Sequence, residues 1–467
     1  MSAAKNGSRP FRPPAPIPHQ RPLGPVRLLL ALRANPVGAW TSVHYEDFFV
    51  QGRSLLGDLC VVSDPAAIRR IFVDNAANYR KDALQLRLLA PGLGNGLLTA
   101  NGEDWRAQRR ALAPLFTPRR VAEFMPAMRD SADWLTARWT GLRDRRRIDL
   151  SSEMSRVTLD VLERTLFPGG LSGDPGDIAR ALTSYFETIG RLDPLDVLNL
   201  PKWIPRFGKK RGGGALEAFG RGVDEMIEKR RRELDARGAP LPHERPDLLT
   251  LLLQARDPET GGGLSHADIR ANVVTFIGAG HETTANALTW SLFLLAHHPD
   301  WRARAEAEVD ADFATGEITE EGLRKLVIVR AVLEESLRLY PPAASLSREA
   351  IGPDDLCGRR IKSGATVVVS PWLVHRHRRL WRDPELFDPS RFLPGAREAI
   401  DRFAYLPFGA GPRGCIGQGF AMQEALVLLA TILKRFRLDC APGHEPMPVQ
   451  RVTLRPRGGM PMLISAR

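Results

Sequence analysis

The ten residues FGAGPRGCIG, numbered 408–417, contain two overlapping patterns. Gly409, Gly411 and Gly414 form G-x-G-x-x-G, the fingerprint of a dinucleotide-binding turn. The same residues place Cys415 in a glycine-rich loop directly before an apolar stretch of helical character. The loop could therefore hold a pyrophosphate, or it could present a thiolate to a metal.

A dinucleotide site makes demands that the neighbouring sequence meets only in part. A helix expected over 418–434 and a segment ending at Asp439 do follow the glycines. However, Pro407 falls in the supposed central strand, and Pro412 removes an amide that should face the phosphate. Only 58 residues follow Gly409, which is too few for the rest of a doubly wound sheet. We therefore disfavour a nicotinamide-dependent dehydrogenase.

A thiolate site explains more of the loop. Cys415 stands at the start of a helix, where backbone amides and the helix dipole favour an anion. Gly411 and Gly417 can adopt positive φ or let the backbone approach a flat cofactor closely. Arg413 can reach a carboxylate on the rim of such a cofactor, and Phe408 can shield the sulfur. A lone cysteine is often just a small buried hydrophobe, but that interpretation leaves the glycine and arginine spacing unexplained.

The composition is that of a globular protein, with 43% hydrophobic and 26% charged residues in 467. Four widely spaced cysteines without a C-x-x-C pair argue against disulfides or structural zinc and fit a reducing cytosol. No apolar run approaches the roughly 20 residues of a membrane span. We expect a cytoplasmic protein and leave a peripheral membrane contact open.

The net charge of +12 could attract nucleic acid, acidic lipid or an acidic protein. Because no nucleic-acid-binding motif accompanies it, solvated helix faces are the simpler explanation and no nucleic-acid partner is expected.

The pattern along the chain predicts a mainly α fold with small β-sheets. A proline-rich arm is expected over 1–38, followed by a single domain over 39–467. Extended runs with a Ser-Gly turn predict a hairpin at 359–370, and a second is expected near 451–464. Helices are expected over 103–115, 121–142, 151–166, 214–237, 265–296, 299–312, 325–339 and 418–434.

The pattern F-x-x-G-x-R-x-C-x-G resembles the haem-binding loop of the cytochrome P450 family. The resemblance extends over about residues 40 to 465 and implies a large helical domain with a small β-rich lobe. It also implies haem b, with the Cys415 thiolate as the axial ligand of the iron. Every defined position of the pattern is matched, by Phe408, Gly411, Arg413, Cys415 and Gly417.

A second motif of the family is E-x-x-R on a helix, supplied by Glu335 and Arg338. An i, i+3 pair of this kind is, taken alone, more often surface decoration. The segment FDPSRF, 387–392, resembles the family segment whose arginine joins the pair, which would be Arg391. We expect these three residues to form a buried scaffold cluster rather than to take part in chemistry.

AGHETT, residues 279–284, lies within a long apolar helix and resembles the family's oxygen-binding segment. There, Gly280 would let a ligand approach beside Ala279, and the Thr283 hydroxyl would open the helix locally. The resemblance implies that Thr283 and Glu282 organise water and proton delivery to dioxygen. Considered alone, this stretch of small residues is more often a packed contact between helices.

Four cations or aromatic residues match family positions that contact the haem propionates. Trp105 and Arg109, in EDWRAQRR, lie at i, i+4 on one helical face, and Lys81 and Arg348 occupy further matching positions. Two negatively charged propionates would attract several converging cations. For any one of these residues considered alone, surface exposure is the simpler expectation.

The sequence says little about the substrate pocket beyond its apolar character. The leucine-rich segment 82–98 would form a loop above the haem, and segments 180–215 and 451–457 would contribute further walls. These features favour a lipophilic small molecule such as a fatty acid or terpenoid. By position in the family, four more residues line the pocket: Phe276, Ala343, Ala344 and Ser345.

The resemblance implies a monomeric monooxygenase that inserts one oxygen atom of O2 into a lipophilic substrate. Because the family-like region fills almost the whole chain, we expect no fused reductase. Two electrons would come from NAD(P)H through a separate reductase and a ferredoxin or flavodoxin. Two alternatives stay open: a haem-thiolate enzyme that uses peroxide or isomerises its substrate, and a haem-based binder without turnover.

Overall fold

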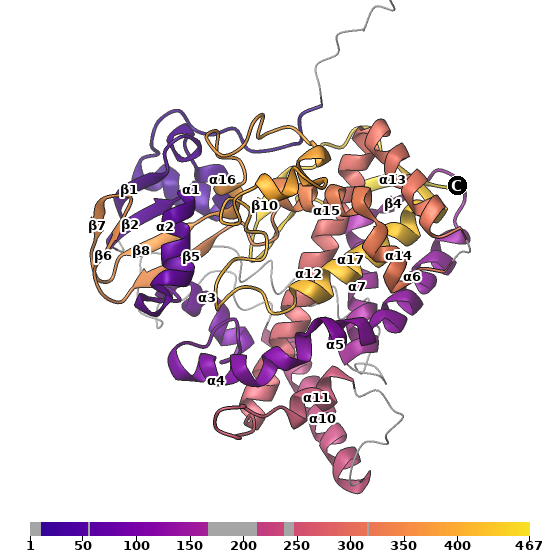
Figure 1. The fold of residues 1–467 in the computed structure, drawn as a ribbon, viewed down its shortest axis with the longest axis horizontal. Coiled ribbons are helices and arrows are strands. Elements are labelled where there is room, and N and C mark those ends of the chain that lie inside the picture. Colours follow the sequence, from indigo (N-terminus) through magenta and orange to yellow (C-terminus); the bar gives the residue numbers. More distant parts are fainter. Residues whose placement is uncertain (1–10, 55–56, 167–212, 238–246, 315–316) are drawn as a thin grey trace, which may run out of the picture.

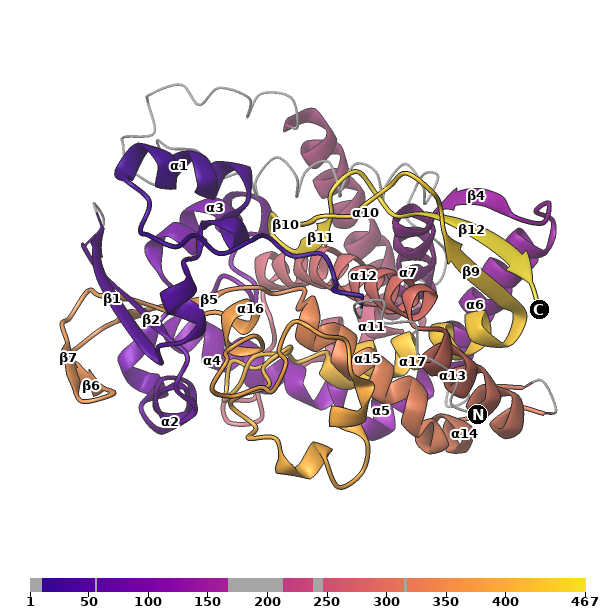
Figure 2. The same ribbon diagram turned by 90° about the horizontal axis from the view of Figure 1, so that it is seen from above.

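The computed structural model describes residues 11–54, 57–166, 213–237, 247–314 and 317–467. A small lobe built around β-strands lies beside a larger body of helices, as both views show (Figures 1 and 2). The long helix α12, His266–His297, runs through the helical body. This arrangement confirms the predicted mainly α fold with small sheets.

The helices follow the predicted ranges closely, apart from one that divides. A single helix is expected over 121–142, but the chain breaks at Phe124, whereas the helix expected over 325–339 begins only two residues late, at Val327. The bounds of the α-helices are α1 (Pro25–Ala34), α2 (Pro65–Arg69), α3 (Ala83–Leu93), α4 (Gly102–Leu112), α5 (Pro118–Glu123), α6 (Met125–Thr140), α7 (Leu150–Leu166), α10 (Gly213–Arg237), α11 (Leu248–Gln254), α12 (His266–His297), α13 (Pro299–Asp312), α14 (Glu320–Lys325), α15 (Val327–Leu339), α16 (Pro371–Val374) and α17 (Gln418–Arg435). Short 3-10 or π turns are η1 (Pro36–Ala39), η2 (Ser42–Tyr45), η3 (Arg70–Asp74), η4 (Ala76–Asn78), η5 (Ala113–Phe116), η7 (Pro389–Phe392) and η8 (Arg397–Ala399). None of the described helices is long and apolar enough to cross a membrane.

The strands form four small sheets in the described part of the chain. The largest has the order β1-β2-β8-β5-β3, in which β2 and β8 are parallel and the other neighbours antiparallel. The others are β4-β12-β9, β10-β11 and β6-β7. The strand bounds are β1 (Phe49–Ser54), β2 (Gly57–Val62), β3 (Tyr79–Arg80), β4 (Arg146–Asp149), β5 (Leu346–Ala350), β6 (Asp354–Leu356), β7 (Arg359–Ile361), β8 (Thr366–Val369), β9 (Phe436–Cys440), β10 (Pro448–Gln450), β11 (Leu454–Pro456) and β12 (Pro461–Ala466).

Both predicted hairpins are wrong in their pairing, although strands occur where expected. Strand β7 pairs with β6, whereas β8 joins β2 and β5 in the large sheet. Near the C-terminus, β11 pairs with β10, and β12 instead joins β4 and β9. A turn signal between two extended runs shows where the chain bends, but the strand partners are chosen by long-range packing that local sequence does not encode.

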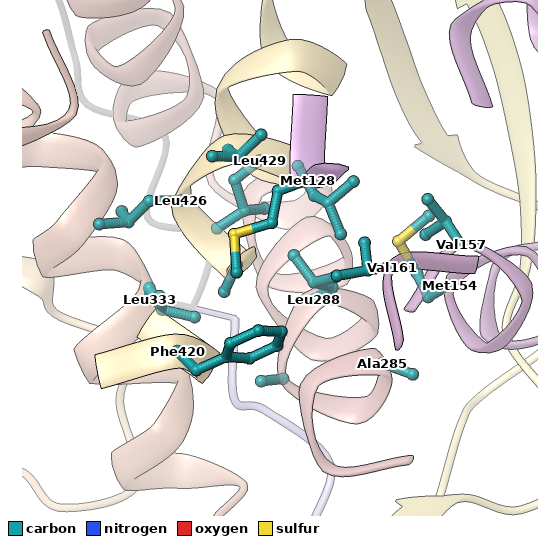
Figure 3. Packing of buried hydrophobic residues seen from close by; sticks show 14 of the residues in the cluster. Met128, Met154, Val157, Val161, Ala285, Leu288, Leu333, Phe420, Leu426 and Leu429 are labelled. Atoms are coloured by element: carbon teal, nitrogen blue, oxygen red, sulfur yellow. The ribbon is translucent and has the colours of Figure 1, made fainter. Parts of the chain in front are cut away.

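Helix α12 forms the centre of the hydrophobic core. Its start is fixed by a capping box, in which Ser265 and Asp268 each accept from the other's backbone amide, at 3.1 and 3.2 Å. Figure 3 shows Ala285 and Leu288 of α12 packed among side chains of α6, α7, α15 and α17. Because apolar residues cover nearly every side of its second half, α12 is buried all round there.

The N-terminal arm is extended over its described part, 11–24, and then enters α1 at Pro25. The expected arm of 1–38 therefore contains a helix that proline content alone did not predict, since Pro25 occupies the first helical turn, where proline is tolerated. Phe11 stacks on His297 with ring centroids 3.9 Å apart, and Pro14 O accepts from the Tyr340 hydroxyl at 3.0 Å. The arm thus packs against the ends of α12 and α15.

The predicted scaffold cluster is present and buried. Arg338 donates to both Glu335 oxygens, at 2.6 and 2.8 Å, and neither side chain is exposed. Its remaining N–H groups bind three backbone carbonyls, those of His375, Pro384 and Leu386. Arg391 Nε lies 3.7 Å from Glu335. Every donor of the Arg338 guanidinium is therefore satisfied, as a buried charge requires.

His375 connects this cluster to the loop that carries Cys415. Burial and the nearby Arg338 charge lower the pKa of His375 to about 3, so its ring is neutral. Nε2 accepts from the Leu406 amide at 2.7 Å, and Nδ1 therefore donates to Arg338 O at 3.1 Å. The segment entering the loop is in this way fixed to α15.

We predict that Glu335→Ala lowers the free energy of unfolding by about 3–5 kcal/mol, because Arg338 would remain charged and unpaired in the interior. Urea unfolding measures the difference. The matched control is Glu321→Ala, which removes the exposed partner of Lys325 on α14 and should change stability little, because solvent screens that pair. Equal losses in the two variants would contradict the assignment of Glu335 to the scaffold.

Candidate functional site

The loop 408–417 is closed by backbone hydrogen bonds. Cys415 N donates to Phe408 O at 2.8 Å, and Gly414 N donates to Gly411 O at 2.9 Å. Gly411 has φ of +69°, and a Cβ there would stand 1.8 Å from Phe72 O. The expectation that Gly411 needs positive φ is thus correct, but what its backbone approaches closely is another part of the chain.

Gly417 differs from Gly411. It has φ of −90°, as the N-cap of α17, and a Cβ built on it would meet no heavy atom within 4 Å. Of the two reasons expected for a glycine here, positive φ does not apply to Gly417, because the chain has already turned into the helix at that point. The close approach of the backbone to a flat cofactor stays a prediction for this residue. A side chain at Gly417 would therefore point into space that no other residue occupies, two positions after Cys415.

The Cys415 sulfur is accessible yet surrounded by protein. Its side chain is exposed, while burial of the thiol by neighbouring atoms raises its pKa above the ordinary value. The Gly417 amide and the Arg109 guanidinium lower the pKa of Cys415, but they do not overcome burial. The helix start alone therefore does not make a thiolate; a bound cation would have to complete it, since metal ligation requires the deprotonated sulfur.

Three of the predicted propionate-binding cations come together. Burial, and then the charges of Arg413 and Arg348, lower the pKa of Lys81 to about 6. Burial and Arg413 lower the pKa of Arg348 to about 10, despite some attraction from Asp82. Within the described residues, no carboxylate forms an ion pair with these three or with Arg109. Their hydrogen bonds go to neutral oxygens, such as that from Lys81 Nζ to Leu97 O at 2.7 Å. Cations that repel one another without a carboxylate partner are a site for an anionic group.

Arg413 is held between an aromatic ring and two oxygen acceptors. Its guanidinium lies 4.3 Å from the centroid of Trp105, and it donates to Ala100 O and Asn101 Oδ1 at 3.3 and 3.2 Å. Trp105 and Arg413, both predicted to contact the cofactor, therefore also stack on each other. Lys81 joins the same group, because its amide donates to Asn101 Oδ1 at 3.2 Å.

The segment before α4 is tied to α12 by a network that sequence reasoning missed. Asn272 accepts from the Leu97 amide at 2.9 Å and donates to Gln108 at 3.0 Å. A Cβ on Gly96 would stand 2.8 Å from Ala271 O, so this segment lies directly on the helix. The network positions the backbone that holds Arg413. Burial of two amide side chains could have pointed to it, but their partners are distant in sequence.

On α12, the predicted oxygen-binding segment turns two residues toward open space. Ala279 is exposed and Thr283 half-buried, whereas Gly278, Glu282 and Thr284 next to them are buried. Thr283 Oγ1 donates to Ala279 O at 2.8 Å, yet the helix continues through this turn, so the predicted local opening is absent. A Cβ on Gly280 would meet Leu162 of α7 at 3.1 Å, so Gly280 serves packing between helices and not ligand approach.

Glu282 lies on a different side of α12 from Thr283. Its carboxylate is buried and lies 3.7 Å from Arg455 on β11. One turn further along, Asn286 donates to Thr453 at 3.4 Å. Glu282 thus fastens the β10–β11 hairpin to α12 in this structure.

A second acid, Glu424 of α17, was not predicted. It is 1% exposed, burial raises its pKa well above the ordinary value, and the Thr284 side chain hydrogen-bonds to it. Glu424 is therefore a buried acid next to the Thr283–Thr284 pair, and burial favours its protonated form. A glutamate within an apolar helix, nine positions after Cys415, was the available sequence signal.

The structure places the predicted pocket residues unequally. Phe276 is half-buried on α12 and packs edge-on against Phe116, and Ala343 and Ser345 are also half-buried. Ala344 is 1% exposed, so the prediction that it lines the pocket is wrong: it packs inward, and its carbonyl accepts from Ser370 at 2.7 Å.

Two of the predicted wall segments also differ from expectation. The expected loop 82–98 is mostly helix, α3, because Asp82 caps its first turn at 3.0 Å. Segment 180–215 lies almost wholly outside the described residues. A hollow of about 800 Å³ lies at the far end of α17, near Lys434, and contains none of the motif residues, so it does not identify the site.

Comparison with known proteins agrees with this geometry. The Cytochrome P450 family model matches residues 56–461. Cyclooctatin synthase from Streptomyces melanosporofaciens is 34% identical over 391 residues, covering 84% of this chain and 83% of that protein. Cyclooctat-9-en-7-ol 5-monooxygenase from the same organism is 36% identical over 351 residues, covering 75% and 74%. The crystal structure of the cytochrome P450DA haem domain matches with a TM-score of 0.81 at 25% identity, covering 98% of this chain and 99% of that one.

The chain belongs to the cytochrome P450 family and is an oxidoreductase of the monooxygenase type. The family binds haem and uses O2 with electrons derived from NAD(P)H. The residues present fit a haem, since an accessible thiol and a group of unpaired cations match an iron and two carboxylates. Among the described residues, no cluster of three or more His, Cys, Asp or Glu side chains offers another metal site.

We predict that Gly411→Ala destabilises the protein by about 3 kcal/mol or more, because a Cβ would overlap Phe72 O and the backbone would be strained. Gly417→Ala, in the same loop, should leave the free energy of unfolding within about 0.5 kcal/mol, since its Cβ meets open space. Thermal or urea unfolding of both variants provides the test. A tolerated Gly411→Ala would show that the contact with Phe72 does not hold the loop.

Proposed function

We propose that this protein hydroxylates a lipophilic small molecule, with haem b held by the Cys415 thiolate. The observation that supports this most strongly is the accessible Cys415 sulfur in a loop fixed by Gly411, beside cations that no described carboxylate neutralises. Lys81, Arg348 and Arg413, with Trp105 and Arg109, would receive the two propionates. When bound, the haem would supply O2 activation, with one oxygen atom passing to the substrate and the other leaving as water.

The chain's own contribution on the α12 side would be proton supply. The Thr283 hydroxyl donates to Ala279 O, so its lone pairs remain free to accept from a water molecule. Burial raises the pKa of Glu424 beside Thr284, which favours its protonated form. Glu282 could join a relay only after leaving Arg455. We therefore propose Thr283 as the orienting hydroxyl, with Glu282 as an acid that reaches it through a side-chain rotation.

For the substrate, we infer a terpenoid or another lipophilic molecule of similar shape. Phe276 and the apolar residues of α3 support an apolar pocket. One relative is named for oxygenating cyclooctat-9-en-7-ol. A fatty acid is the second candidate, and titration of both classes against the haem absorption bands would separate them.

We further propose that an acidic ferredoxin or flavodoxin delivers the electrons. The net charge of +12 supports this, because opposite charge speeds the encounter of redox partners. Turnover should then slow as ionic strength rises. A rate independent of salt would argue against electrostatic docking.

The absorption spectrum of the reduced protein with carbon monoxide tests the axial ligand. We expect a strongly red-shifted Soret band, because a thiolate donates electron density to the iron, and Cys415→Ala should abolish it. Cys440→Ala is the matched control, since Cys440 lies next to His297 and away from the loop, and it should leave the band unchanged. A spectrum typical of histidine ligation in the unmodified protein would refute the proposal.

Thr283→Ala should uncouple electron use from product formation. Without the hydroxyl, electrons should still be consumed but should leave mostly as hydrogen peroxide, and Thr283→Ser should restore coupling because it keeps the hydroxyl. The measurement is the ratio of product and peroxide to NAD(P)H consumed. An unchanged product yield per electron in Thr283→Ala would remove this residue from the mechanism.

A further inference from the structure

The short element η3, Arg70–Asp74, is a π turn, in which the Asn75 amide donates to Arg70 O, five residues back, at 2.8 Å. A turn of this kind contains one residue more than an α-helical turn, is rare, and is frequent at functional sites. Helix α2 runs directly into it, so the wide turn continues a helix instead of belonging to a loop. The middle residue of the turn, Phe72, is the part that reaches the candidate site.

Phe72 meets the candidate site at two points. Its carbonyl oxygen lies so near Gly411 that a Cβ on that glycine would be 1.8 Å away. Its ring centroid lies 5.1 Å from the guanidinium carbon of Arg348. Because Phe72 is 3% exposed, both contacts are made inside the protein. The position of this one residue therefore bears on the loop that carries Cys415 and on a cation expected to receive a propionate.

One carboxylate, that of Asp354 on β6, holds both ends of the turn. Its Oδ1 accepts from Arg70 Nε and Nη2 at 2.9 and 2.6 Å. Its Oδ2 accepts from Asn75 Nδ2 at 3.0 Å and from the Tyr79 hydroxyl at 2.8 Å. Arg70 begins the turn and Asn75 follows its last residue, so the wide spacing of the turn is fixed from outside by a single side chain.

This carboxylate is buried and charged. Asp354 is 4% exposed, and burial by itself would raise its pKa, but the hydrogen bonds from Arg70, Tyr79 and Asn75 outweigh burial and lower the pKa to about 2. Hydrogen bonds to an ionised acceptor are stronger than those between neutral groups. Loss of the carboxylate would also leave the buried Tyr79 hydroxyl without its acceptor.

We propose that Asp354 is a positioning residue for the axial thiolate: by holding both ends of the π turn, it keeps Phe72 O against Gly411 and so keeps the Cys415 loop in the shape that ligates the iron. The inference rests on the proposed role of Cys415 as the haem ligand. Without the carboxylate, the turn would relax toward α-helical spacing, which would move the Phe72 carbonyl. A purely structural Asp354 would affect stability and leave the state of the sulfur unchanged.

The spectrum of the reduced holoenzyme with carbon monoxide separates these two roles, because it reports on the sulfur and not on the fold as a whole. In urea well below the unfolding transition, we expect Asp354→Ala to lose the red-shifted Soret band about tenfold faster than the parent protein. Asp354→Asn keeps an oxygen but not the charge, and its rate should be intermediate. Tyr79→Phe removes one donor, should act more weakly in the same direction, and provides the test if Asp354→Ala does not fold.

The matched control is Asn78→Ala. The Asn78 side chain accepts from the Gly352 amide at 2.7 Å and donates to Gly352 O at 3.2 Å, so it joins the same two parts of the chain from outside the turn. This variant should lower the urea midpoint of unfolding without changing the rate at which the band is lost. Equal rates in Asp354→Ala and the parent, or an equal acceleration in Asn78→Ala, would overturn this inference alone. A parent protein without the red-shifted band would refute ligation by Cys415, and this inference with it.

Discussion

The buried charge of Arg338 constrains the rest of the structure. A guanidinium without solvent must have all five N–H groups paired, and here they bind one carboxylate and three carbonyls from 375–386. Those carbonyls can converge only if the irregular segment after α16 folds back on α15. His375 then carries the constraint to Leu406 and so to the loop that presents Cys415. The Glu335–Arg338 pair, which takes no part in the proposed chemistry, thus helps to determine the position of Cys415.

The candidate site is electrostatically incomplete in two complementary ways. Burial raises the pKa of Cys415, which disfavours the thiolate, and burial lowers the pKa of Lys81, Arg348 and Arg413, which disfavours the cations. A group that carries a cationic metal at its centre and carboxylates at its rim would relieve both. Binding of such a group would therefore favour the Cys415 thiolate and the charged forms of the three cations. The free energy of binding would in turn depend on the protonation of these four side chains.

Much of this could be predicted from sequence, because the decisive signals are local. The Cys415 loop, the Glu335–Arg338 pair and the long helices have fixed spacings that one stretch of chain contains. Strand pairing, the Asn272 network and the role of Glu282 could not be predicted, since each depends on a partner that the fold brings from far along the chain. The same holds for Gly417 and Ala344, whose environments depend on neighbouring elements. Composition misjudged the arm for a simpler reason, because Pro25 can begin a helix as readily as it extends a chain.

The contact between Gly411 and Phe72 joins the two lobes at the cysteine loop, since Phe72 belongs to the β-rich lobe and Gly411 precedes α17. These residues are more than 300 positions apart, so the loop can reach its final shape only after the chain has closed that long circuit. The shape of the loop that carries Cys415 is therefore coupled to the packing of the two lobes against each other. A substitution that separates Phe72 from Gly411 would disturb the loop from a distance, without touching any residue of the motif.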